Sequence, residues 1–171
     1  MLHCQYMTFS HFDETIIRDA RKIAMPLARI ALFIIFFWFG VLKVMGISPA
    51  DPLVGALLER TIPFFSFDYF RVFFGAYEMT IGISFLIAGM ERVAIALLIP
   101  HMAAAFLPLI ILPSITWQSV LVPTFIGQYI IKNIVIISLA LSIATHLRPL
   151  QIKSEARNLK SETNTNARNS K

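Results

Sequence analysis

The stretch IALFIIFFWFGVL, residues 30–42, contains no ionisable side chain and decides the fold class. It lies in an apolar run, residues 26–46, that reaches the roughly 20 residues needed to cross about 30 Å of hydrocarbon. Runs of similar length follow at 69–89, 92–112 and 128–147. We therefore expect an all-α polytopic membrane protein built as a bundle of four transmembrane helices.

The composition also favours a membrane protein. Of the 171 residues, 57% are hydrophobic and 15% are charged, which is too few polar side chains to cover a water-facing globule. The net charge of +5 comes from basic residues that lie mostly outside the apolar runs, and this indicates contact with anionic lipid headgroups rather than nucleic acid. The single cysteine, Cys4, excludes an internal disulfide framework and a CxxC redox pair.

The chain divides into three parts. Residues 1–25 are expected to form a cytoplasmic amphipathic segment, because apolar residues such as Ile16 and Ile23 recur at helical spacing between charged ones, as in a helix on a membrane surface. Residues 26–147 are expected to form the transmembrane domain. Residues 148–171 contain too few apolar residues to fold alone and are expected to form a disordered basic cytoplasmic tail.

Two connections are long enough to carry structure of their own. Between the first and second runs, Asp51 and Pro52 are typical of a helix start and Pro63 of its end, so we expect a short interfacial helix there. The connection 113–127 has no charge and too many prolines and hydroxyls for a clean helix. We expect it to lie in the interface or to dip back into the bundle, with Trp117 as an interfacial anchor.

The distribution of lysine and arginine predicts the orientation. Four spans place most basic residues on one side of the membrane: those before the first run, those between the second and third runs, and those after the fourth. We therefore expect a multi-pass protein of the bacterial inner (plasma) membrane with both termini in the cytoplasm.

Among the ionisable residues of the apolar runs, four are candidates for a site: Lys43, Glu78, His101 and Lys132. Placing such a group in hydrocarbon costs free energy, so each one needs a partner within the protein or a functional role. Helix geometry puts Lys43, Glu78 and Lys132 in the same outer half of the bilayer, where they are able to meet. A Lys–Glu pair that only fixes helix packing is one interpretation. The surplus lysine would instead suit an anionic or carbonyl-bearing ligand.

His101 also has two interpretations. It lies near the middle of the third run and follows Pro100, which leaves a backbone carbonyl without its helical donor. In a structural role, the ring donates a hydrogen bond to that carbonyl. In a functional role, it acts as a proton relay or donates a hydrogen bond to a quinone carbonyl.

We expect no metal site, and the sequence favours a non-catalytic or accessory membrane subunit over a self-contained enzyme. His3, Cys4 and His11 come nearest to a ligand cluster, but their spacing matches no zinc pattern. The sequence has no glycine-rich phosphate loop and no Ser-His-Asp arrangement assignable to one site, which argues against a hydrolase or a nucleotide enzyme.

Three motifs resemble the DoxX-like superfamily of small membrane proteins: FFWFGVLKVMGI at 36–47, YEMTIGISFLIAG at 77–89 and PTFIGQYIIKN at 123–133. The likeness covers residues 26–147, and GQYIIKN is its most specific part. It implies a four-helix membrane bundle related to the DoxD subunit of thiosulfate:quinone oxidoreductase, to the DoxX proteins of oxidative-stress complexes and to a group linked to reactive-chlorine resistance, whose long outer loop this chain lacks. The residues that carry over by position are Lys43, Glu78, Gln128, Lys132 and Asn133.

The leading hypothesis is an accessory or quinone-contacting subunit of a membrane redox or oxidative-stress complex, with quinone as its ligand and a soluble or membrane oxidoreductase as its partner. Its binding residues would be Lys43, Glu78, His101, Gln128, Lys132 and Asn133. The first alternative is a small transporter or channel for an anion or weak acid, which would use an unpaired lysine as counter-charge. The second is a structural membrane scaffold without catalysis. All three are compatible with a homo-oligomer.

Overall fold

The computed structural model describes the backbone of residues 2–147 and the side chains of residues 13–147. The predicted tail, residues 148–171, lies outside the described residues, and so do the side chains of His3, Cys4 and His11.

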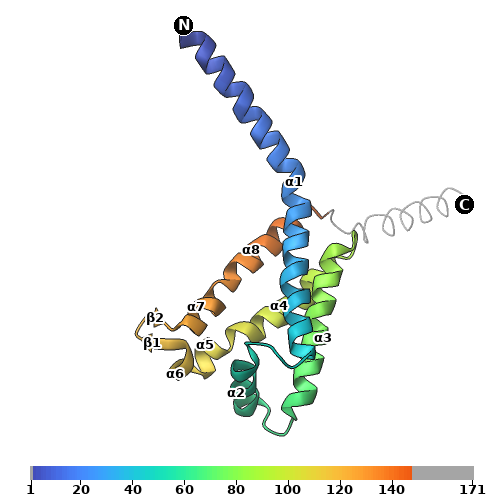
Figure 1. Ribbon diagram of the computed structural model, residues 1–171, viewed down its shortest axis with the longest axis vertical. Coiled ribbons are helices and arrows are strands. Elements are labelled where there is room, and N and C mark those ends of the chain that lie inside the picture. Colours follow the sequence, from blue (N-terminus) through green and yellow to red (C-terminus); the bar gives the residue numbers. More distant parts are fainter. Residues whose placement is uncertain (1, 148–171) are drawn as a thin grey trace, which may run out of the picture.

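The described chain is mostly helical, as predicted, and its long helices run alternately up and down (Figure 1). In order, its elements are α1 (Leu2–Val44), α2 (Asp51–Thr61), α3 (Phe67–Leu86), α4 (Glu91–Phe106), α5 (Pro108–Ile111), α6 (Pro113–Thr116), β1 (Trp117–Ser119), β2 (Val122–Pro123), α7 (Phe125–Ile131) and α8 (Asn133–Ala144).

Three helical stretches are long and apolar enough to cross a membrane: Asp13–Val44, Glu91–Ile111 and Phe125–Ala144. They correspond to the first, third and fourth predicted runs, and they indicate a multi-pass membrane protein. The second run forms α3, which has 20 residues but is less apolar because it contains Arg71 and Glu78.

The N-terminal segment differs from the prediction of a separate amphipathic helix over residues 1–25. α1 instead continues without a break through Pro26 into the first apolar run. A proline removes a single amide donor from the helical hydrogen-bond ladder, and the helix formers Met25, Leu27 and Ala28 surround this one. In Figure 1 the N-terminal part of α1 projects beyond the other elements as a long rod.

α1 and α3 lie side by side and antiparallel (Figure 1). Their backbones approach through two glycines, because a Cβ placed on Gly75 would lie 2.7 Å from the Gly40 carbonyl oxygen and 3.0 Å from the Cβ of Lys43. Small residues of this kind let membrane helices pack closely. The glycines therefore set the distance between the two helices.

The other long helices pack against this pair. α4 contacts α3, and α8 contacts both α4 and α1. The core between them contains Leu32, Phe36, Ile81, Phe85, Ala94, Leu98, Met102, Ala140 and Ile143. A partly buried ion pair from Arg29 to Glu91 joins α1 to the start of α4.

The two connections follow the predictions in part. The expected interfacial helix is present as α2, which begins at Asp51 and ends before Pro63. The connection 113–127 has no long helix, as expected, but the hairpin of β1 and β2 within it was not predicted. A hydrogen bond from the Trp117 indole to the Leu109 carbonyl, at 3.0 Å, holds this segment to the preceding one. Within the segment, the Thr124 hydroxyl donates to the Ile115 carbonyl at 2.7 Å.

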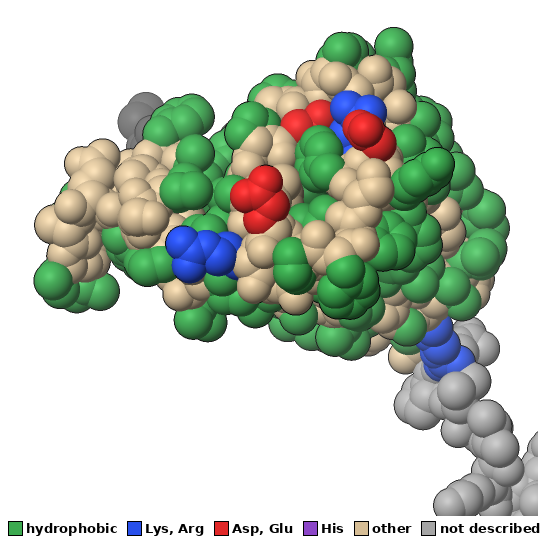
Figure 2. Space-filling model, turned by 90° about the horizontal axis from the view of Figure 1, so that it is seen from below, with side chains coloured by type: hydrophobic (Ala, Val, Ile, Leu, Met, Phe, Trp, Pro, Cys, Tyr) green, Lys and Arg blue, Asp and Glu red, His purple; other side chains and the backbone are tan. Residues whose placement is uncertain are grey.

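The end of the molecule that carries α2 has few basic residues, chiefly Arg60 and Arg71. Figure 2 views this end and shows hydrophobic side chains over much of the face, with separate small groups of acidic and basic side chains between them. One such group joins α2 to α3, because Arg71 lies 3.6 Å from Asp51 and 3.3 Å from Asp68.

The close contact at Gly75 predicts that two adjacent substitutions in α3 differ strongly in their effect on the free energy of unfolding. Gly75→Leu forces a side chain into the backbone of α1 and should lower the free energy of unfolding by about 1–3 kcal/mol, the usual cost of overpacking. Ala76→Leu places the same side chain on an exposed position and is the matched control. Thermal melting in detergent checks this, and equal melting temperatures for the two variants would contradict the close approach.

Candidate functional site

Lys43 and Glu78 form a buried ion pair between α1 and α3. The Lys43 Nζ lies 2.7 Å from Glu78 Oε2, and the two residues are only 4% and 5% exposed. Lys43 lies one turn beyond Gly40 and Glu78 one turn beyond Gly75, so the pair sits directly beside the closest approach of the two helices. The sequence prediction that these two residues meet agrees with this geometry.

His101 is the third member of this cluster and reaches it from α4. Its Nε2 atom lies 3.6 Å from Glu78 Oε1, too far for a good hydrogen bond but close enough for electrostatic contact. Its ring stacks on Phe74 at a centroid distance of 5.1 Å and meets the edge of Phe36 at 5.3 Å. Three helices therefore converge on one group of polar side chains with an aromatic lining.

The second ring nitrogen of His101 has no partner. Nδ1 is buried and forms no hydrogen bond with any described residue. The structural interpretation expected the ring to donate a hydrogen bond to the carbonyl that Pro100 leaves free. The structure does not contain that hydrogen bond. A buried polar atom without a partner costs about 1–3 kcal/mol, so this atom is a ready contact for a hydrogen-bonding group of a ligand.

The charges of the cluster balance. The Lys43 ammonium faces the Glu78 carboxylate and also lies 5.7 Å from the centre of the Phe74 ring. Each buried charge thus has an opposite partner, which is the usual condition for charges inside a low-dielectric environment. A neutral polar ligand fits such a cluster better than a free anion does.

The other predicted site residues lie elsewhere. Lys132 and Gln128 are exposed, and Asn133 is half-buried at the start of α8. Among residues 13–147, Lys132 makes no ion pair and does not join Lys43 and Glu78, so the predicted meeting of all three holds for only two. The helix is interrupted at Lys132, between α7 and α8, and sequence spacing alone did not reveal this break.

Two features of the site were not anticipated from the sequence. The aromatic lining comes largely from α3, where Phe70, Phe74 and Tyr77 recur every three or four residues beside Glu78. That spacing was the available signal. The Arg29–Glu91 pair was also missed, although an arginine within the first apolar run indicated a buried partner.

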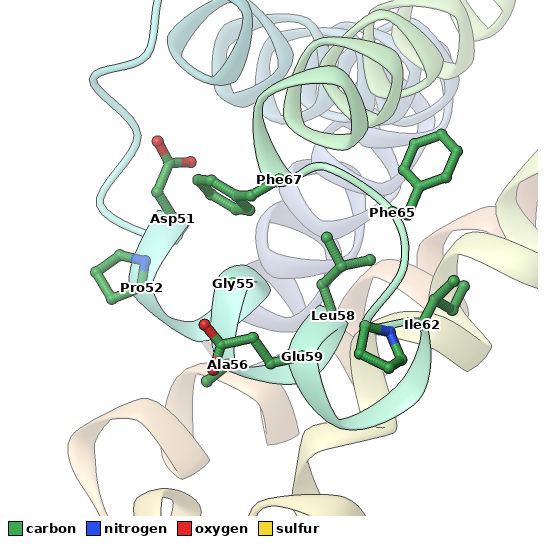
Figure 3. Close-up of a pocket in the computed structure, with 10 residues that line it drawn as sticks. Asp51, Pro52, Gly55, Ala56, Leu58, Glu59, Ile62, Phe65 and Phe67 are labelled. Atoms are coloured by element: carbon green, nitrogen blue, oxygen red, sulfur yellow. The ribbon is translucent and has the colours of Figure 1, made fainter.

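A separate groove of about 610 Å³ lies between α2 and the start of α3 (Figure 3). Its lining residues are Asp51, Pro52, Gly55, Ala56, Leu58, Glu59, Ile62, Pro63, Phe65 and Phe67. None of them belongs to the Lys43–Glu78–His101 cluster. The groove is mostly apolar, and its two carboxylates come from α2.

Comparisons with models of protein families, with curated proteins and with solved structures found no match to this chain. The resemblance of its motifs to the DoxX-like superfamily therefore stays a prediction, and the candidate site rests on geometry.

The ion pair predicts an unequal response to single and double substitution. Glu78→Gln leaves the Lys43 ammonium buried without a counter-charge and should lower the free energy of unfolding by about 3–5 kcal/mol. Replacing both partners in the variant Lys43→Met with Glu78→Met removes the stranded charge and should recover most of that loss.

Lys132→Met is the control for this comparison, because it removes an exposed lysine and should change stability by less than about 0.5 kcal/mol. Chemical denaturation in a fixed detergent measures all three variants. A double variant as unstable as Glu78→Gln would argue against a direct pair.

Proposed function

We propose that this protein crosses the membrane four times, with α3 as a fourth span beside the three more apolar ones. The 20 residues of α3 are the number that a crossing needs. Its central charge, Glu78, faces Lys43 rather than lipid, and Arg71, near its end, is held by Asp51 and Asp68. The low apolar character of α3 is thus explained by side chains that have partners within the protein.

The proposed orientation puts both termini in the cytoplasm. The N-terminal part of α1, which carries Arg18, Arg21 and Lys22, projects from the same end of the bundle as the turn between α3 and α4 (Figure 1). The α2 end, with few basic residues, would face the other side. This arrangement follows the excess of basic residues in cytoplasmic segments.

The proposed activity is that of a quinone-contacting accessory subunit in a membrane redox or oxidative-stress complex. The observation that carries this proposal is the buried Nδ1 of His101, which has no partner among the described residues. Its ring stacks on Phe74 and lies next to the neutralised Lys43–Glu78 pair. A quinone headgroup is neutral and planar and has carbonyl oxygens that accept hydrogen bonds. In the cluster, the neutralised ion pair suits a neutral headgroup, the aromatic rings suit a planar one, and the His101 ring is able to form a hydrogen bond with a carbonyl oxygen.

Access from the bilayer supports the same ligand. Phe73 is 65% exposed and stacks on Tyr77, which in turn lies 6.3 Å from the His101 ring. A row of aromatic side chains thus leads from the outer surface of α3 to the cluster. An apolar ligand dissolved in the membrane would reach the cluster along this row after a rotation of Tyr77, whose hydroxyl donates to the Leu97 carbonyl at 2.7 Å.

In this role the chain binds and orients the quinone, and a partner oxidoreductase would exchange electrons with it. His101 would donate or accept one hydrogen bond, while Lys43 and Glu78 fix the helices around it. The resemblance to the DoxX-like superfamily agrees with such a division of labour. Anion transport fits the site less well. Lys132 is exposed and does not join Lys43 and Glu78, so it supplies no surplus cation beside the ion pair.

Bound quinone tests this proposal. We expect the wild-type protein, purified in mild detergent, to retain quinone that solvent extraction and mass spectrometry quantify. His101→Phe keeps an aromatic ring against Phe74 but removes the ring nitrogens, and it should lower the quinone affinity about tenfold, equivalent to about 1.4 kcal/mol.

Lys132→Met is the matched control and should retain quinone like the wild type. If neither the wild type nor the control holds quinone, or if His101→Phe binds it as well as they do, the cluster is a packing device and the scaffold hypothesis takes the place of the proposal.

A further inference from the structure

α1 carries a row of exposed apolar side chains on the face opposite the bundle. Ile16 is 51% exposed, Ile23 is 59% exposed and Ile34 is 52% exposed. The other face of the same helix packs into the core through Leu32 and Phe36. The exposed row therefore has no partner among the described residues.

The spacing of this row is that of a coiled coil. Its positions alternate in steps of four and three residues, and we call the row the α1 seam: Ile16, Ala20, Ile23, Leu27, Ile30 and Ile34. A heptad repeat of this kind has a period of 3.5 residues and keeps one narrow stripe against a neighbouring helix. Asp13 continues the register toward the N-terminus as a single polar position, a feature that coiled coils use to fix register.

Apart from Asp13, the charged side chains of residues 13–34 lie off the seam. Glu14, Arg18, Arg21 and Lys22 fall between its positions, and Lys22 pairs locally with Asp19 at 3.2 Å. The N-terminal part of α1 thus has a charged side that is stable in water and an apolar seam that favours burial against a partner. This division is what a helix needs when it docks along one face only.

α1 is longer than the hydrocarbon layer is thick, so the N-terminal part of the seam lies outside the membrane. A helix of 43 residues is about 65 Å long at about 1.5 Å per residue, roughly twice the hydrocarbon thickness. Residues 27–44 of this helix pack against α3, whereas the part before Met25 projects alone (Figure 1). A single projecting helix gains nothing from tertiary packing and leaves its isoleucines in water.

We propose that the α1 seam binds the α1 seam of a second copy of this chain, as a parallel coiled coil that begins in the cytoplasm and continues into the bilayer. The orientation must be parallel, because every copy is inserted in the membrane in the same direction. Outside the membrane the buried isoleucines supply the driving force. Inside it, Ile30 and Ile34 replace lipid contacts with contacts to the partner helix.

The uninterrupted path of α1 favours this occupant over a membrane surface. A helix that lies on the bilayer has to turn away from the span that follows it, whereas α1 passes through Pro26 as one helix. The seam also keeps one register across that proline, from Ile23 to Leu27 and Ile30. One straight partner helix accounts for both halves of the seam.

Cysteine cross-linking in native membranes tests the proposal. In a Cys4→Ser background of the full chain, Ile23→Cys places a thiol on the seam and Arg21→Cys places one off it. Mild oxidation should convert most of the Ile23→Cys protein to a disulfide-linked dimer, with at least a fivefold lower yield for Arg21→Cys.

Equal yields from the two variants, or no dimer from either, would overturn the proposal, and a lipid surface would then be the occupant of the seam. Native mass spectrometry of the detergent-solubilised protein supplies a second readout. The wild type and Arg21→Asn should give the dimer of the 19.3 kDa chain, and Ile23→Glu should shift at least tenfold toward the monomer. A monomeric wild type contradicts the seam interface.

Discussion

The close approach of α1 and α3 is the constraint on which the rest of the structure depends. Gly40 and Gly75 bring the two backbones together, and Lys43 and Glu78 use the resulting short distance to form a 2.7 Å ion pair. The glycines without the charges would leave a plain packing contact. The charges without the glycines would be two unpaired ions in hydrocarbon, at a cost of several kcal/mol.

The Lys43–Glu78 ion pair also helps to position the other groups of the candidate functional site. Because Glu78 is engaged by Lys43 on one oxygen, its other oxygen faces His101 of α4. The aromatic side chains around His101 exclude water and leave Nδ1 without a partner. A polar contact is thus available in an apolar setting, and this combination is the physical basis for proposing a quinone as the ligand.

The sequence predicted the helices well and the site in part. Hydropathy alone located α3 and the apolar stretches Glu91–Ile111 and Phe125–Ala144 to within a few residues, because roughly 20 apolar residues have few other structures available in lipid. It also located the end of α1, but not its start at Leu2. The Lys43–Glu78 pair was predictable from the cost of buried charge. Lys132 was misplaced: its side chain is exposed in the structure, whereas the sequence suggested that it could meet Lys43 and Glu78. The β1–β2 hairpin and the unbroken passage of α1 through Pro26 depend on local hydrogen bonds and helix continuity that residue patterns do not specify.

The most direct test of the central claim is a distance measurement between the two charged groups in a lipid bilayer. Solid-state NMR of protein labelled with ¹⁵N at lysine Nζ and ¹³C at glutamate carboxyl groups should detect a strong dipolar coupling. Lys43–Glu78 is the only lysine–glutamate ion pair among residues 13–147. The coupling should vanish in Lys43→Met and persist in Lys132→Met. A wild-type spectrum without this coupling would contradict the account.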